Sequence, residues 1–221
     1  RKGSAPESVI APREVRYITF TRLKEDVKQQ VINSFLIDDI PTLVDRIQFD
    51  DLSELYFDGS MVPDDWYCKG DMKTRLQKRS GHESIFVQIS HVINDVQPDS
   101  LVVLDSVTEI AAQCNTPALR NNLTGFLRGL QRVAKQRNIT QYLLLSRGIL
   151  DSSKERELAD IADAVLLFKW EESSGARRQR VMYFEKFRGV MPHLEERDLV
   201  KFAVRISTSS GFEVSNIRVV I

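Results

Sequence analysis

An apolar run that ends in a carboxylate is the feature of this sequence most capable of chemistry. Residues 101–106 are Leu-Val-Val-Leu-Asp-Ser, so Asp105 and Ser106 directly follow four aliphatic residues. Such a run is typical of a strand buried on both faces of a parallel sheet, and ligands bind at the carboxyl ends of these strands. An Asp at that position can hold a magnesium ion directly or through water. The structural alternative is an Asp that only caps the next turn.

The elements around this run alternate between strand and helix for two thirds of the chain. Strands are predicted over 15–21, 52–57, 101–104 and 142–145, and helices over 23–35, 83–96, 117–137 and 154–161. Four further strands follow, over 164–168, 181–187, 202–206 and 212–220. The alternation predicts an α/β fold with a mostly parallel sheet and helices on both faces, and the later strands predict an antiparallel C-terminal extension. We expect the strands beginning at Val15, Leu52, Leu101, Tyr142 and Ala164 to run parallel.

Length and composition predict one domain over residues 1–221, with an irregular segment at 1–14 and a surface insertion at 61–81. The 31 basic and 31 acidic residues balance, so net charge gives no reason to expect nonspecific binding to nucleic acid or membranes. No apolar stretch approaches the roughly 20 residues that a membrane-spanning helix needs. Two cysteines, Cys68 and Cys114, are too few for a disulfide framework, which predicts a reducing, cytoplasmic location.

The insertion carries cations that allow two interpretations. The basic residues are Lys69, Lys73, Arg75, Lys78 and Arg79, and Trp66 and Tyr67 precede them. Cations beside aromatic side chains can bind nucleic acid by phosphate pairing and base stacking. Acidic residues also lie in and beside this segment, at Asp64, Asp65, Asp71 and Glu83, so a solvated loop of mixed charge is the stronger interpretation.

Several segments together resemble the KaiC-like family of RecA-superfamily ATPases. Residues 101–110 (LVVLDSVTEI) resemble the family's Walker B strand. Residues 185–189 (EKFRG) with His193 resemble its Lys-x-Arg-Gly segment and trailing His, and residues 160–165 and 210–214 resemble its late helix-to-strand step and closing hairpin. The resemblance covers about residues 15–221. It implies a RecA-like three-layer fold, ATP and magnesium as ligands, and a homo-oligomer or a related RecA-like subunit as partner.

The resemblance also implies two sets of site residues. Asp105, Ser106 and Ser146 would form a nucleotide pocket, with Asp105 holding the magnesium ion. Lys186 and Arg188 would reach the nucleotide of a neighbouring subunit. These two cations stand two residues apart on a predicted strand, so their side chains project from the same face. The alternative is a solvated strand edge, where such cations discourage aggregation.

Two departures from the family pattern favour a degenerate ATPase. No G-x-x-x-x-G-K-[ST] phosphate loop occurs in the sequence, and in the nearest candidate, residues 3–8 (GSAPES), Glu7 stands where the Lys would be. Thr21 and Arg22 appear where the family has two Glu residues that activate water, and neither can accept a proton as Glu does.

These features predict a non-catalytic RecA/KaiC-like domain that acts in regulation or signalling, through assembly or partner binding. Two alternatives remain open. One is a working ATPase whose phosphate loop lies in residues missing here, since the chain begins with Arg1 rather than Met. The other is a DNA-repair accessory protein that uses the basic insertion.

Overall fold

The computed structural model describes residues 11–58, 60–67, 84–173, 177–197 and 199–216. Two four-stranded sheets form its framework. The first is parallel, in the order β2-β1-β3-β4, and its strands are β1 (Val15–Thr19), β2 (Ile47–Asp51), β3 (Leu101–Asp105) and β4 (Thr140–Leu143). The second is antiparallel, in the order β5-β6-β7-β8, and its strands are β5 (Ala164–Ser173), β6 (Arg177–Phe187), β7 (Lys201–Ser207) and β8 (Gly211–Asn216).

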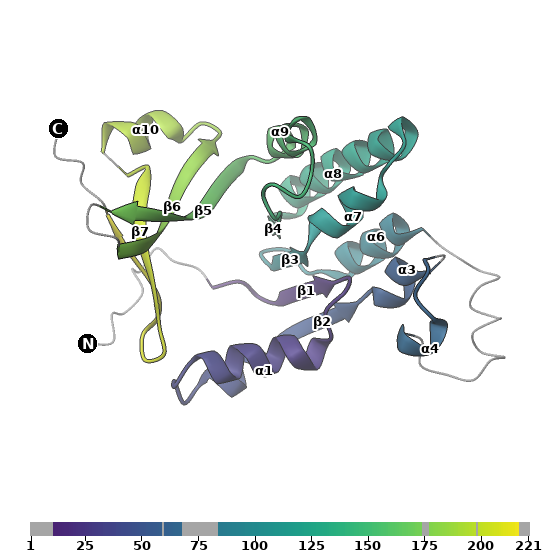
Figure 1. Cartoon of the computed structure of the whole chain (residues 1–221), viewed down its shortest axis with the longest axis horizontal. Helices are drawn as coiled ribbons and strands as arrows, with labels where there is room; N and C mark the ends of the chain where they lie inside the picture. Colours follow the sequence, from purple (N-terminus) through teal and green to yellow (C-terminus); the bar gives the residue numbers. More distant parts are fainter. Residues whose placement is uncertain (1–10, 59, 68–83, 174–176, 198, 217–221) are drawn as a thin grey trace.

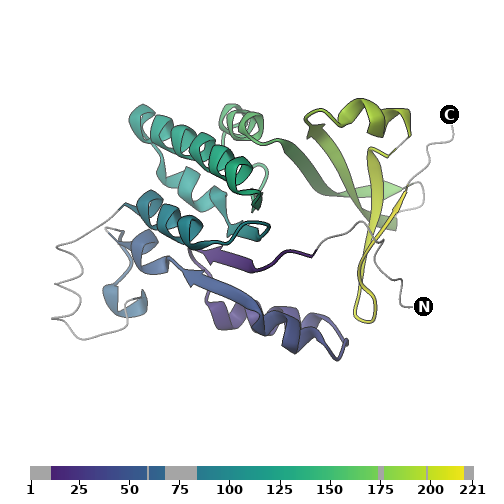
Figure 2. The same cartoon turned by 180° about the vertical axis from the view of Figure 1, so that it is seen from behind.

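Helices lie on both faces of the parallel sheet, which gives the three layers expected for a RecA-like fold (Figure 1). Figures 1 and 2 show α1 on one face and α6, α7 and α8 on the other. The helices are α1 (Lys24–Ser34), α2 (Ile40–Asp45), α3 (Ser53–Phe57), α4 (Asp64–Tyr67), α6 (Ile85–Asp95), α7 (Val107–Gln113), α8 (Pro117–Arg137), α9 (Ser152–Ile161) and α10 (Met191–Glu196). Among the described residues, no helix is both long enough and apolar enough to cross a membrane.

The main core lies between the parallel sheet and helices α6, α7 and α8. Ile18 of β1 and Val102 and Leu104 of β3 are almost fully buried. They pack in one cluster with buried side chains that include Ile89 of α6 and Leu127 of α8. Full burial of a side chain of this size contributes about 1.5–3 kcal/mol, so this cluster fixes the position of β3 and of Asp105 at its end.

Local signals in the sequence set the ends of the longest helix. The hydroxyl of Thr116 accepts a hydrogen bond from the amide of Leu119, and Pro117 occupies the first turn of α8, where its missing N–H has no cost. Asn138 ends the helix in the left-handed conformation, with φ of +54°. These signals confirm the helix predicted over 117–137.

The strand predicted over 52–57 is wrong. β2 ends at Asp51, and residues 53–57 form the short helix α3. Leu52 is buried, and Leu55 and Tyr56 pack against the core. These apolar positions follow the i, i+3, i+4 spacing of a helix face rather than the alternation of a strand.

The prediction that the Ala164 strand joins the parallel sheet is also wrong. β5 pairs with β6 in antiparallel orientation, from Ala164 opposite Phe187 to Ser173 opposite Arg177. The two strands are neighbours in the chain, so a long hairpin satisfies their backbone locally. β4 therefore forms one edge of the parallel sheet, and the predicted antiparallel extension begins one strand earlier than expected.

The remaining differences concern short elements. Helices α2, α7 and α10 were not predicted, and β4 ends at Leu143, two residues before its predicted end. Helix α4 lies within the predicted insertion at 61–81, and most of that insertion, including all five of its basic residues, lies outside the described residues. Residues 1–10, which contain the candidate phosphate loop, also lie outside them. Ala11–Glu14 form neither helix nor strand.

Candidate functional site

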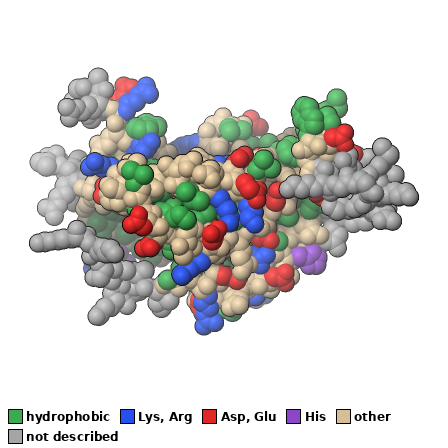
Figure 3. Space-filling model, turned by 90° about the horizontal axis from the view of Figure 1, so that it is seen from below, with side chains coloured by type: hydrophobic (Ala, Val, Ile, Leu, Met, Phe, Trp, Pro, Cys, Tyr) green, Lys and Arg blue, Asp and Glu red, His purple; other side chains and the backbone are tan. Residues whose placement is uncertain are grey.

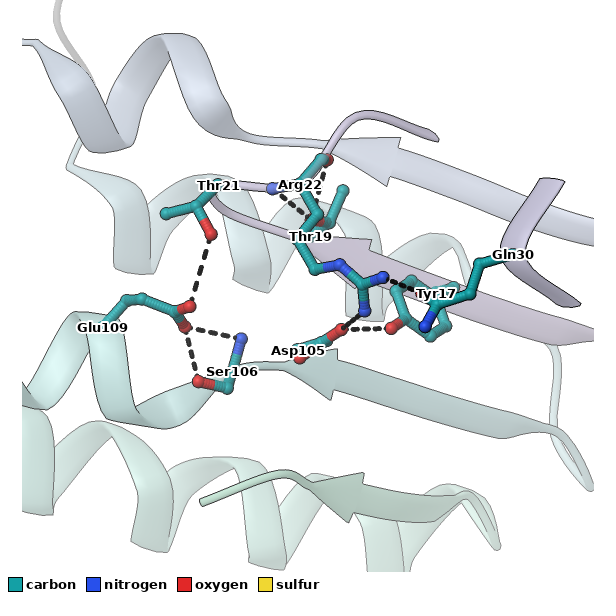
Figure 4. Close-up of polar contacts among 8 residues, drawn as sticks. All are labelled: Tyr17, Thr19, Thr21, Arg22, Gln30, Asp105, Ser106 and Glu109. Carbon is teal, nitrogen blue, oxygen red and sulfur yellow. Dashed lines mark hydrogen bonds and ion pairs between the residues drawn. The ribbon is translucent and has the colours of Figure 1, made fainter. Parts of the chain in front are cut away.

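The carboxyl ends of β1 and β3 bring Asp105 and Ser106 together with Thr21 and Arg22 (Figure 4). β1 and β3 are parallel neighbours, and Thr19 at the end of β1 lies opposite Asp105 at the end of β3. The chain that leaves β1 therefore passes beside Asp105. Arg22 from this segment donates a hydrogen bond to Asp105, with 3.2 Å between Nη1 and Oδ2, and the two groups form an ion pair.

Three neighbouring side chains hold this pair in place. The Tyr17 hydroxyl donates a hydrogen bond to the same Oδ2 atom of Asp105, and the Arg22 guanidinium also donates to the side-chain oxygen of Gln30 on α1. The Thr19 hydroxyl accepts from the Arg22 amide and donates to the Arg22 carbonyl, at 3.2 and 3.0 Å, which fixes the turn after β1. Burial, followed by the hydrogen bond to Asp105, raises the pKa of the Tyr17 phenol. Tyr17 therefore remains a donor to the carboxylate.

A second polar group lies next to this pair, at the start of α7. The Ser106 amide donates to Oε2 of Glu109 at 2.8 Å, and the Ser106 hydroxyl donates to the same oxygen. The other oxygen, Oε1, accepts from the Thr21 hydroxyl at 3.3 Å. Ser106 and Glu109 thus form a capping box that starts α7 directly after β3. Because Thr21 joins this box and Arg22 joins Asp105, the two residues after Phe20 connect β1 to β3 and α7.

In this arrangement Arg22 competes with a magnesium ion for Asp105, and the magnesium contact stays a prediction. Oδ2 of Asp105 accepts from both Tyr17 and Arg22, which leaves Oδ1 as the oxygen that a divalent cation could bind. The guanidinium also places a positive charge where the cation would bind, and like charges repel. Within the part of the chain that the structure describes, no group of three or more His, Cys, Asp or Glu side chains is placed to hold a metal ion.

Ser146 lies near the site without joining it. Its amide donates to the hydroxyl of Thr108 on α7 at 2.8 Å, which ties the loop after β4 to the helix that follows Asp105. Its side chain is exposed. Ser146 therefore belongs to the same end of the sheet, and a nucleotide contact from it stays a prediction.

Lys186 and Arg188 lie elsewhere, at the end of α9. The Lys186 ammonium donates to the carbonyls of Ala159 and Asp160 at 3.2 and 2.7 Å, and Arg188 donates to the carbonyl of Asp160 at 2.8 Å. The last carbonyls of a helix have no partner within it and carry partial negative charge, so both cations stabilise the C-terminus of α9. The proposed contact with a neighbouring subunit stays a prediction.

Four residues of the site were not singled out from the sequence: Tyr17 and Glu109, which contact the site carboxylate and Ser106, and Thr19 and Gln30, which hold Arg22. Glu109 had a recognisable signal, because Ser106-Val107-Thr108-Glu109 matches the S-x-x-E pattern of a capping box. Tyr17 had none, because its reach to Asp105 depends on the parallel register that places it opposite Val103, two residues before Asp105.

Comparison with known proteins agrees with this fold. The KaiC ATPase family model matches residues 11–214. The solved structure of a KaiC-like protein from the hyperthermophilic archaeon Pyrococcus horikoshii OT3 is similar, with a TM-score of 0.52 and 15% sequence identity over 91% of this chain and 75% of that chain. Comparison with the curated proteins gives no match. Because the family model matches nearly the whole chain, this protein belongs to the KaiC ATPase family.

Proposed function

We propose that this chain is a KaiC-like domain that does not hydrolyse ATP and that acts in regulation or signalling by assembling with itself or with a partner. The observation that carries the proposal is the ion pair between Arg22 and Asp105. In an ATPase of this type, an Asp at a strand end helps to bind the magnesium ion that accompanies the nucleotide. Here the Asp105 carboxylate already has an intramolecular cation, which opposes the binding of a second one.

Residues on the other side of the site also support the proposal. Hydrolysis needs a base that orients or deprotonates water. Thr21 and Arg22, in the turn after β1, donate hydrogen bonds to Glu109 and Asp105 and accept no proton from water. The sequence also contains no phosphate-loop motif whose amides and Lys could hold a triphosphate.

A working ATPase is the second candidate, and the match to an ATPase family favours it. In that case the phosphate loop would come from residues outside this sequence, and Arg22 would have to leave Asp105 when magnesium binds. Glu109, whose carboxylate contacts Thr21 and Ser106, would be the candidate base.

Calorimetry of the full-length protein with ATP, in the presence and absence of magnesium, separates the two candidates. The proposal predicts no magnesium-dependent binding and no ATP hydrolysis above the level of a control without protein. Tight binding that requires magnesium, together with hydrolysis that Asp105→Ala abolishes, would instead establish the ATPase. Asp99→Ala is the matched control, because Asp99 pairs with Arg13 away from the site.

A further inference from the structure

The outermost strand of the parallel sheet, β4, combines an apolar sequence with an open position. Residues 142–145 are Tyr-Leu-Leu-Leu, an apolar run like that of β3, and such runs are typical of strands buried on both faces. In the structure, however, β4 is the last strand of the order β2-β1-β3-β4. Tyr142, Leu144 and Leu145 are 52%, 42% and 36% exposed. The sequence of this strand is therefore that of an interior strand, whereas its position is that of an edge.

The backbone of β4 also has hydrogen-bonding groups that point away from the sheet. Alternate residues of a strand direct their N–H and C=O groups to opposite sides. The amide of Leu144 donates to the carbonyl of Leu104 at 3.1 Å, so Leu144 is directed towards β3. Leu143 and Leu145 are therefore directed to the open side, where no described residue pairs with their N–H groups. Such groups are the template on which another strand pairs.

The other edge of the same sheet is protected against strand pairing. Its outer strand, β2, ends in Asp50 and Asp51, and charged side chains on an edge strand oppose the addition of another strand. Residues 140–145 contain neither a charged residue nor a proline, which is another common form of protection. The parallel sheet thus has one protected edge and one edge that is open to a further strand.

Side chains on both faces of β4 are placed to contact an added strand. Leu143 packs against the main core, which lies on the side of α6, α7 and α8. Tyr142 precedes it in the strand, so its side chain lies on the opposite face of the sheet, where α1 lies (Figure 1). A strand at the usual distance of about 4.7–4.9 Å from β4 would therefore cover apolar area on both faces.

The partner that fits this edge is a polypeptide in extended conformation. Only a polypeptide backbone supplies donors and acceptors at the two-residue spacing that Leu143 and Leu145 present. Nucleic acids are bound mainly by cations, and residues 140–145 contain none. The face shown in Figure 3 has acidic and basic side chains intermixed, with no extended basic surface among its described residues. Charge therefore favours a protein partner over a nucleic acid.

We propose that the open edge of β4 binds an extended segment of another protein, which adds a fifth strand to the parallel sheet. The segment matches the uncharged edge, with apolar or β-branched residues at alternate positions and no charge over about four residues. Backbone hydrogen bonds to Leu143 and Leu145 hold the segment, and its side chains pack on Tyr142 and Leu144. This inference specifies the partner in the partner-binding part of the proposed function and rests on that part.

A labelled synthetic peptide, Lys-Val-Thr-Val-Thr-Val-Lys, tests the proposal on the unchanged full chain. Fluorescence anisotropy should show saturable binding of this peptide. A version methylated on every backbone nitrogen keeps the side chains but has no backbone donor, so it should bind at least about tenfold more weakly. Of the two versions methylated on alternate residues, at least one should retain the affinity, because a strand pairs through the donors along one side only. No binding of the unmethylated peptide, or equal binding of the fully methylated one, overturns the proposal.

Variants of the chain test the same edge from the other side. Tyr142→Lys and Leu144→Lys should each weaken peptide binding by at least about tenfold, because a charge on an edge strand opposes pairing. Ile149→Lys is the matched control, because it adds the same charge at an exposed apolar position in the loop beyond β4. If all three variants bind the peptide as the parent does, β4 is not its site.

Hydrogen exchange locates the bound peptide at single residues. The amides of Leu143 and Leu145 should exchange freely in the chain alone and become protected when the peptide binds. Amides that the peptide leaves unprotected overturn the proposal. Amides already protected in the chain alone overturn it too, in favour of a segment of the same protein or, where light scattering shows an oligomer, a second copy. None of these outcomes bears on ATP binding or hydrolysis, so the two proposals can fail separately.

Discussion

Arg22, in the turn after β1, forms an ion pair with Asp105 at the end of β3, with 3.2 Å between Nη1 and Oδ2. Asp105 is the more buried partner, with 15% of its side chain exposed against 42% for Arg22. The exposed partner can therefore be removed by mutation while the carboxylate stays in its place between Tyr17 and the end of the strand.

Arg22→Ala should tighten the binding of Mg²⁺ to the protein. An ion pair of this exposure contributes up to about 1 kcal/mol, so its removal should strengthen Mg²⁺ binding at Asp105 by several-fold. Calorimetric titration with Mg²⁺ measures the change. Arg13→Ala is the control, because it removes the ion pair with Asp99 outside the site. Equal Mg²⁺ affinity in the parent and in Arg22→Ala would mean that Arg22 does not exclude the cation.

Tyr17 should make the stability of the protein depend on alkaline pH. Burial and then the hydrogen bond to Asp105 raise the pKa of Tyr17 above its ordinary value of 10.0. The folded state therefore holds this proton more tightly than the unfolded state does. The resulting stabilisation is complete below pH 10 and is lost as the pH rises through the folded pKa, so the free energy of unfolding falls above about pH 10.

Urea unfolding at a series of alkaline pH values measures this effect. Tyr17→Phe should reduce the fall in the free energy of unfolding, because the unfolded state then has one phenol fewer to ionise. Tyr142→Phe, at an exposed position, should retain the parent's slope. If Tyr17→Phe also keeps the parent's slope of unfolding free energy against pH, folding does not raise the pKa of the Tyr17 phenol.

Lys186→Ala and Arg188→Ala together should destabilise the protein by about 1–2 kcal/mol. The reason is the loss of their hydrogen bonds to the last carbonyls of α9 and of two positive charges at the helix C-terminus. Thermal unfolding by circular dichroism measures this loss, and a double variant as stable as the parent would contradict it. If these cations also form the predicted subunit contact, an oligomer formed by the parent should dissociate in the double variant. Light scattering on both proteins tests this.

Asp50→Asn should destabilise the protein through the edge strand β2. Arg16 of β1 donates two parallel hydrogen bonds to Asp50, at 2.9 and 2.8 Å, and both side chains are mostly buried. Loss of the charge should cost about 1–3 kcal/mol. Asp45→Asn is the control, because Asp45 is largely exposed in its pair with Lys28 and should cost less than about 1 kcal/mol. If the two variants unfold at similar urea concentrations, the ion pair between Arg16 and Asp50 contributes no more to stability than the exposed pair between Lys28 and Asp45.

The parts of the fold that the sequence predicted correctly depend on long, regular patterns. The aliphatic run before Asp105 forms β3, and the apolar face of residues 117–137 forms α8. β2 was missed because its sequence, Ile-Gln-Phe-Asp-Asp, has two acidic residues that disfavour strands. Tertiary contacts make it a strand: Arg16 pairs with Asp50, and the ring of Tyr17 lies 5.3 Å from that of Phe49.

The site was predicted in position but not in its contacts. The aliphatic run placed Asp105 at a strand end, and the resemblance to the family placed Thr21 and Arg22 at the positions of its two water-activating Glu residues. The ion pair itself depends on which strand lies next to β3, and short motifs do not determine strand order. From the sequence, Arg22 is a residue that replaces one of the family's Glu residues. The structure shows in addition that Arg22 forms an ion pair with Asp105.

The two sheets differ in how far along the chain their pairings reach. In the antiparallel sheet, each strand pairs with the next one in sequence. In the parallel sheet, by contrast, Val15 pairs with Leu101, and the segment of chain between them contains β2 and several helices. Local pairings form faster than distant ones, because less chain entropy is lost before contacts form. Amide protons of β6 and β7 should thus become protected early in refolding, and those of β1 and β3 late. The ion pair between Arg22 and Asp105 would then be among the last contacts to form.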